Sequence, residues 1–183
     1  MESSPAAVAY PRPWHFTLIV FVSSACTMIL ELVAGRIVAP YVGVSLYTWT
    51  SIIGVVLAGL SLGNYLGGKL ADRWGSFRLL GILFLSAGLL STGILAADVL
   101  GLRVPGDWPI IVRILALTAA LFFLPSVLLG TISPVVTKLA VRDLAQTGST
   151  VGRISAAGTV GSIVGTVSSA STMSSVSAVD AGS

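Results

Sequence analysis

Glu31 is the residue of this sequence best placed to do chemistry, because it lies inside a long run of apolar residues. The run extends from about Phe16 to Val38, which is enough to cross a bilayer as one helix. A carboxylate at that depth costs about 2.5–3.5 kcal/mol on membrane-insertion scales. We therefore expect Glu31 to take a partner or a proton.

Arg113 is the partner that the sequence suggests for this carboxylate. The first apolar segment ends at one membrane face, and the fourth begins at that same face. Arg113 lies near the start of the fourth segment. At 1.5 Å per residue, Arg113 lies about 6 Å deep from that face and Glu31 about 8 Å deep. We predict a Glu31–Arg113 pair that holds two helices together. The alternatives are a proton or cation site, and no contact between the two side chains.

A second polar group lies in the short connection after the second apolar segment. Asp72 is expected just past the end of a helix, and Gly75 at the turn. An acid and bases in such a loop can pair with neighbouring helix ends and control how two helices rock. The alternative is a basic loop that only sets topology. The residues of this loop motif are Gly68, Asp72, Arg73, Gly75 and Arg78.

Other kinds of site have no support in the sequence. No cluster of His, Cys, Asp and Glu has the spacing of metal ligands, so we predict neither a metal nor a cofactor. The run from Gly63 to Leu70 nearly spells a phosphate-binding loop, but Leu70 stands where Ser or Thr must bind magnesium. A net charge of +3 without a basic run argues against nucleic acid as a partner. We predict no catalytic residue.

The composition indicates what must position these residues. Hydrophobic residues make up 55% of the chain and charged residues 9%, with a mean hydropathy of +0.97. Soluble domains carry about 25% charged residues, so lipid is the expected solvent. We predict an all-α membrane protein, a bundle of about five transmembrane helices. The expected spans are 16–38, 46–68, 79–100, 109–131 and the marginal 151–167.

Small residues recur at every fourth position on two of these segments. Such ladders let helix backbones approach closely in lipid, so we expect them to pack helices together, the alternative being a transport path lined by the same glycines. Asn64, beside the first ladder, is predicted to hydrogen-bond to a neighbouring helix. The ladders are Gly59, Gly63 and Gly67 on the second segment, and Ala157, Gly161 and Gly165 on the fifth.

Basic residues predict the orientation, because Lys and Arg favour cytoplasmic loops. Seven of them fall on one side of the predicted bundle, and only Arg103 lies clearly in a loop on the other. We therefore expect a multi-pass protein of the cell membrane with a cytoplasmic N-terminus. The seven are Arg12, Lys69, Arg73, Arg78, Lys138, Arg142 and Arg153.

The chain divides into three parts on this basis. We expect a cytoplasmic tail at 1–14, a transmembrane helical domain at 15–167 and a serine-rich tail at 168–183. The last is predicted to be disordered, because it has few large apolar residues. Since it interrupts the fifth helix, we also expect a truncated or frame-shifted product.

Two sets of motifs carry a family resemblance. Gly68, Asp72, Arg73 and Gly75 match the loop Gly-x-x-x-Asp-Arg-x-Gly of major facilitator transporters, although Ser76 stands where a base is common. A longer match resembles the transmembrane domain of membrane-bound spermidine synthase-like proteins, also described as fused transporter/spermidine synthases. Its residues are those at 30–43, 47–54, 125–130 and 151–165.

The resemblance implies a helical domain, similar to part of a six-helix facilitator half, that precedes an aminopropyl-transferring synthase domain. None of the synthase motifs is present in this chain, so whether the protein takes part in an enzyme stays open. We expect a membrane domain linked to polyamine metabolism, with the lipid bilayer and a separate or severed synthase domain as partners. The alternatives are a small-cation or polyamine transport module and a non-functional truncated fragment.

Overall fold

The computed structural model describes residues 13–43, 45–99, 108–141 and 147–180, and within these ranges the chain is helical, with no strand. The fourth helical rod is continuous from α4 through the π-helical turn η1 to α5. The described residues thus form five helical rods, which confirms the predicted all-α bundle. Their bounds are α1 (Pro13–Val42), α2 (Leu46–Trp74), α3 (Phe77–Val99), α4 (Ile110–Thr118), η1 (Ala119–Phe123), α5 (Leu124–Ala140) and α6 (Thr147–Asp180).

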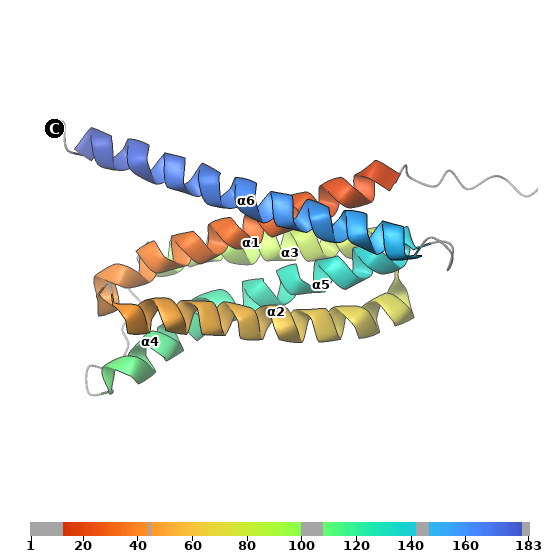
Figure 1. Ribbon diagram of the computed structural model, residues 1–183. Coiled ribbons are helices and arrows are strands. Elements are labelled where there is room, and N and C mark those ends of the chain that lie inside the picture. Colours follow the sequence, from red (N-terminus) through yellow and green to blue (C-terminus); the bar gives the residue numbers. More distant parts are fainter. Residues whose placement is uncertain (1–12, 44, 100–107, 142–146, 181–183) are drawn as a thin grey trace, which may run out of the picture.

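The rods lie roughly side by side in two layers (Figure 1). Helix α6 packs mainly on α1, and α2 packs mainly on α5. Helix α3 covers the far side of α5, and α1 also contacts α5 and so joins the two layers. The C-terminal half of α6 diverges from the other helices (Figure 1).

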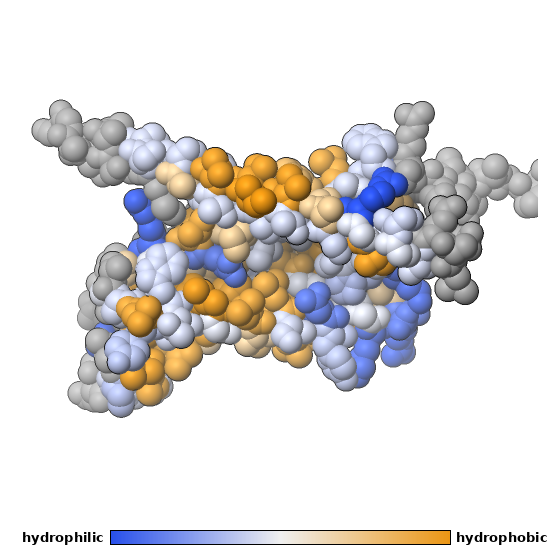
Figure 2. All heavy atoms as spheres, viewed as in Figure 1, coloured by the Kyte–Doolittle hydropathy of each residue, from blue (hydrophilic) through white to orange (hydrophobic). Residues whose placement is uncertain are grey.

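Three of the helices are long and apolar enough to cross a membrane. Their apolar stretches are Trp14–Ala39, Leu46–Trp74 and Ile111–Ala140, whereas that of α3 is the shorter Phe77–Gly93. Large apolar side chains cover the outside of the bundle, such as Leu85, which is 77% exposed. Figure 2 shows orange apolar residues along the middle of one face. Exposed apolar surface of this extent suits lipid as its surroundings, so the chain is a membrane protein.

Five of the seven described Lys and Arg residues gather at one end of the bundle, whereas Arg36 and Arg113 lie toward the other. The C-terminal ends of α2 and α5 and the N-terminal ends of α3 and α6 meet there (Figure 1). We call it the basic end, and it carries Lys69, Arg73, Arg78, Lys138 and Arg153. Arg12, Arg103 and Arg142, which also entered the orientation prediction, lie outside the described residues.

The turn between α2 and α3 is shorter than predicted. Helix α2 continues to Trp74, so Asp72 and Arg73 lie in its last turn and not in a loop. Only Gly75 and Ser76 connect the helices, and the Ser76 side chain accepts a hydrogen bond from the Leu79 amide at 3.3 Å. The prediction of a turn at Gly75 is therefore confirmed, but the placement of Asp72 beyond the helix is wrong.

The serine-rich segment is helical and not disordered, which corrects the prediction for 168–183 as far as Asp180. Its hydroxyls donate back to carbonyls one turn earlier, as from Ser169 to Gly165 at 2.8 Å and from Thr172 to Ser168 at 2.9 Å. Such bonds satisfy the hydroxyl without taking an amide from the helix. The compositional rule for disorder therefore does not hold for this segment.

The fourth rod extends beyond the predicted 109–131 to Ala140 and contains the π-helical turn at 119–123. Pro125 follows one residue after this turn. Proline has no amide hydrogen, and its ring clashes with the carbonyl four residues earlier, which here is that of Leu121 in the turn. The wider turn accommodates the ring, so the rod continues through Pro125 as one helix.

The glycine ladder of α2 is the seam between α2 and α5. A Cβ atom at Gly59 would lie 2.7 Å from the Cβ of Ser126, and one at Gly67 would lie 2.7 Å from the Thr131 carbonyl oxygen. At Gly63 it would collide with the Val127 carbonyl oxygen. The predicted packing role of this ladder is confirmed.

A second seam joins α6 to α1. A Cβ atom at Gly161 would collide with the Phe21 carbonyl oxygen, and one at Gly165 would lie 2.6 Å from that of Ala25. The packing role predicted for these two glycines is also confirmed. Both seams bring main chains together without intervening side chains, which maximises dispersion contact in lipid.

Gly63→Ala should destabilise the bundle, because its methyl group meets a backbone carbonyl that cannot move aside. Overpacking of this kind costs about 1–3 kcal/mol. The matched control is Gly68→Ala on the same helix, where an added Cβ has no atom within 4 Å. There alanine should stabilise the helix by about 0.5–1 kcal/mol. Unfolding of the purified variants in detergent measures both changes, and equal stabilities would contradict the seam.

Gly161→Ala should loosen α6 alone, because α6 contacts the rest of the bundle mainly through α1. Hydrogen exchange followed by mass spectrometry should show faster exchange in α6 and unchanged exchange in α2 and α5. Gly152→Ala is the control, since an added Cβ there meets nothing within 4 Å. Identical exchange in the two variants would refute the α1–α6 seam.

Candidate functional site

Glu31 lines a hollow of about 470 Å³ between α1, α2, α5 and α6, and we call it polar because hydroxyl, amide and carboxylate side chains stand in its largely apolar wall. The carboxylate is half-buried, and among the described residues that line the hollow it is the only charged group. Figure 2 shows hydrophilic residues in the hollow between α2 and the layer of α1 and α6, with apolar residues around them. The other polar residues that line it are Ser23, Ser24, Thr27, Asn64, Ser133 and Ser162.

Three of these hydroxyls share a helix face with Glu31. Thr27, Ser24 and Ser23 precede it by four, seven and eight residues, and this spacing places side chains on one face of a helix. The Thr27 hydroxyl donates to the Ser23 carbonyl at 2.9 Å, which leaves its oxygen able to accept a further bond. The sequence prediction missed these residues, although their spacing from Glu31 could have revealed them.

Small residues lie on the helices that line the hollow together with α1. Ser162 of α6 lines the hollow, and so does Gly130 of α5, where a Cβ atom would lie 2.7 Å from the Leu60 carbonyl oxygen. Next to the hollow, a Cβ atom at Gly158 would lie 3.1 Å from the hydroxyl oxygen of Ser24. Gly130 and Gly158 therefore allow close helix contact at the edge of the hollow.

Asn64 does not make the predicted hydrogen bond to a neighbouring helix. Its side chain is exposed and lines the hollow from α2, and it has no hydrogen-bond partner in the described part of the chain. The reason lies in the seam beside it. Gly63 and Gly67 occupy the face of α2 that contacts α5, so Asn64 projects beside the contact and not across it.

The predicted Glu31–Arg113 ion pair is not formed. Within the described residues the structure contains one ion pair, and it joins other side chains. Arg113 does not line the hollow of Glu31, and its buried Nε atom has no hydrogen-bond partner. Depth along the membrane normal fixes the height of a side chain but not its direction around the helix, and these two side chains differ in direction.

The ion pair that the structure does contain joins Asp72 of α2 to Lys138 of α5. The Lys138 Nζ atom lies 2.6 Å from the Asp72 Oδ1 atom. Their side chains are 71% and 58% exposed, so solvent at the basic end weakens the attraction. The acid of this motif thus pairs with a neighbouring helix end, and its control of how two helices rock stays a prediction. Arg73 is exposed, and Arg78 lies in the first turn of α3.

A second polar hollow, of about 440 Å³, lies beside this ion pair. Asp72 and Gly68 line it from α2, and Thr137 and Lys138 line it from α5. Asn64 and Ser133 line it too, and both also line the hollow of Glu31. The two hollows therefore adjoin.

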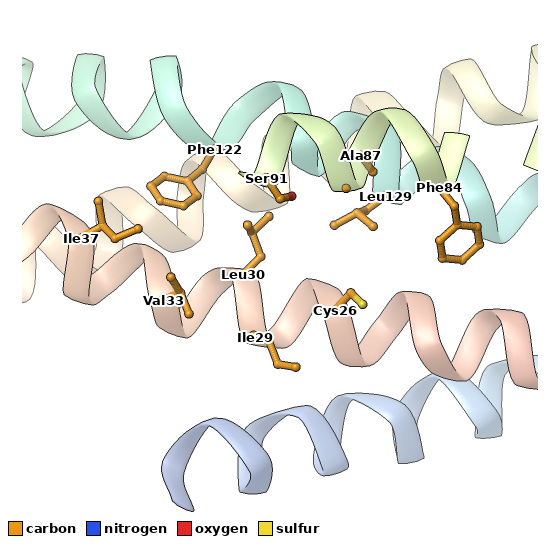
Figure 3. Close-up of a pocket in the computed structure, with 11 residues that line it drawn as sticks. Cys26, Ile29, Leu30, Val33, Ile37, Phe84, Ala87, Ser91, Phe122 and Leu129 are labelled. Atoms are coloured by element: carbon orange, nitrogen blue, oxygen red, sulfur yellow. The ribbon is translucent and has the colours of Figure 1, made fainter. Parts of the chain in front are cut away.

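A third hollow, of about 380 Å³, is different in chemistry (Figure 3). It lies between α1, α3 and the η1–α5 rod, and its wall is almost wholly aliphatic and aromatic, with Leu30, Phe84 and Phe122 among its residues. Cys26 and Ser91 are its only side chains with a hetero atom. This wall accepts hydrocarbon and offers a cation no counter-charge.

The described residues contain no group of three or more His, Cys, Asp and Glu side chains that could hold a metal ion. Comparison with protein-family models, with curated proteins and with solved structures finds no match to this chain. The resemblance to membrane-bound spermidine synthase-like proteins, and the synthase partner that it implies, stay predictions.

The Asp72–Lys138 pair should contribute a small, salt-dependent stability. A double-mutant cycle with Asp72→Asn and Lys138→Gln should give a coupling energy of about 0.2–1 kcal/mol, which falls as salt screens the charges. A cycle of Asp72→Asn with Arg36→Gln is the control, because Arg36 is an exposed cation on α1 toward the opposite end of the bundle. Equal coupling in both cycles would mean that the measured energy reflects general charge and not this contact.

Proposed function

We propose that this bundle binds and carries a small organic cation within the membrane, with Glu31 as its counter-ion. One observation carries the proposal: Glu31, on a helix able to span the membrane, is the only charged side chain among the described residues that line its hollow. Intramembrane carboxylates are costly and mark ion or substrate paths in membrane proteins. Since none of the Lys, Arg and His residues that the structure describes lines the hollow, the charge of Glu31 favours a cation over an anion.

The lining of the hollow suits an ammonium group. An ammonium ion has three N–H donors and no acceptor, whereas carboxylate, hydroxyl and amide oxygens all accept. Glu31 supplies the charge, and Ser24, Thr27 and Asn64 supply further oxygens. A volume of about 470 Å³ lies within the range of small-molecule sites, about 300–1,000 Å³. One carboxylate balances one ammonium group, so the ligand is a monoamine or one end of a longer amine.

The motif resemblance supports polyamines as the natural class of amine. It also supports a link to polyamine metabolism for the membrane domain, in keeping with a ligand that carries ammonium groups. We further propose that the protein lies in the cell membrane with the basic end and the N-terminus on the cytoplasmic side. The basic residues Lys69, Arg73, Arg78 and Lys138, which share one end of the bundle, support this orientation.

Glu31→Gln should weaken cation binding while keeping the shape of the side chain. Loss of a hydrogen bond to a charged group costs about 1.5–3 kcal/mol, which predicts about 10- to 100-fold weaker binding. Equilibrium binding of radiolabelled methylammonium and putrescine to purified protein measures the change, and uptake into proteoliposomes measures transport.

Arg113→Gln is the control for this experiment. Arg113 lies at a similar predicted depth but outside the hollow, so the variant should bind as the original protein does. If Glu31→Gln binds both amines unchanged, the hollow is not the cation site.

A further inference from the structure

The hollow of Glu31 continues toward one end of the bundle. Asn64 and Ser133 form part of its wall and also part of the wall of the hollow at the Asp72–Lys138 pair. The two spaces thus adjoin at these side chains, which come from α2 and α5. Together they line a path, called the track below, from Glu31 to the basic end.

Toward the opposite end, no polar hollow lined by the described residues adjoins that of Glu31, and the apolar third hollow shares only Leu129 with it. The nearest hollow there, of about 190 Å³, is lined by Arg36 and Trp49, and it shares no residue with the hollow of Glu31. The Trp49 ring lies directly over Gly35, so close that a Cβ atom there would be 2.8 Å from it. The two ends of the bundle therefore give unequal access to the carboxylate.

Water is the solvent that such a track requires. Asn64 and Ser133 are exposed, and neither side chain has a hydrogen-bond partner within the described ranges. Hydrocarbon offers an amide or a hydroxyl no partner, so polar groups at this depth face a water-filled space or other polar groups. The track opens beside exposed charges at the membrane surface, where water is available.

We infer that water fills this track, so that Glu31 is reached from the basic end of the bundle and is closed to the opposite end. The inference rests on the proposed function, to which it adds the route of the cation. A small hydrated cation enters beside Asp72, passes Asn64 and Ser133, and stops at Glu31.

Cysteine labelling tests the route. In a Cys26→Ser background, Asn64→Cys and Ser133→Cys are reconstituted in proteoliposomes of known orientation and treated with a membrane-impermeant maleimide on one face. Both thiols should react from the basic-end face, at least tenfold faster than a lipid-facing thiol at similar depth. The lipid-facing thiol is that of Leu85→Cys. Leu85 lies about 12 Å from the start of α3, and Asn64 lies about 15 Å from the end of α2, so the two lie at similar distances from the basic end.

Leu46→Cys controls the other face. Leu46 begins α2 at the end opposite to the basic end and is 81% exposed, so its thiol should react only from that side. Ser162→Cys, on the α6 wall of the hollow, is a further variant whose thiol should react like that of Asn64→Cys. A single symmetric peak in gel filtration verifies that each variant is folded.

The inference is overturned if the Asn64 and Ser133 thiols react no faster than the Leu85 thiol, or equally from both faces. Labelling needs no bound cation, so the test is separate from the binding experiment. One-sided labelling in a protein that binds neither methylammonium nor putrescine supports the water path and refutes the proposed function alone.

Discussion

Lipid tails are as apolar as leucine, so helices inside a bilayer gain little from burying apolar side chains against one another. What holds them together is dispersion contact between surfaces that fit closely, and glycine allows the closest fit. In this bundle Gly59, Gly63 and Gly67 bring the main chain of α5 against α2, and Gly161 and Gly165 bring α1 against α6. These two seams fix how α2 sits on α5 and how α6 sits on α1.

The polar hollow follows from the same seams. Asn64 comes directly after Gly63, and Ser133 directly before Pro134, whose Cγ atom would meet a Cβ atom at Gly67. The seam between α2 and α5 thus sets both side chains beside each other. Glu31 lies on α1, which α6 holds at Phe21 and Ala25. A carboxylate in the membrane is tolerated because this packing surrounds it with groups that can hydrogen-bond.

Much of the fold could be predicted from the sequence, because helix length, apolar composition and glycine spacing are local properties. The five rods and both seams follow from them. The Glu31–Arg113 pair could not be tested by depth alone, since the direction of a side chain around its helix depends on which neighbours pack there. Lys138 as the partner of Asp72 required knowing which helix ends meet. The prediction of disorder for the serine-rich end of α6 was wrong because it applied a compositional rule that holds for chains in water.

The spacing of the seams also limits how the bundle can move. Carbonyl groups of α5 lie against glycines of α2 that are four residues, or about 6 Å, apart along the helix. If one helix slid along the other by less than this distance, side chains would run into the opposing backbone. Helices α2 and α5 are thus locked in register as one body, and α1 and α6 as another. The walls around Glu31 come from both bodies. If the α2–α5 pair rocked against the α1–α6 pair, the hollow around Glu31 would widen or narrow while both seams stayed intact.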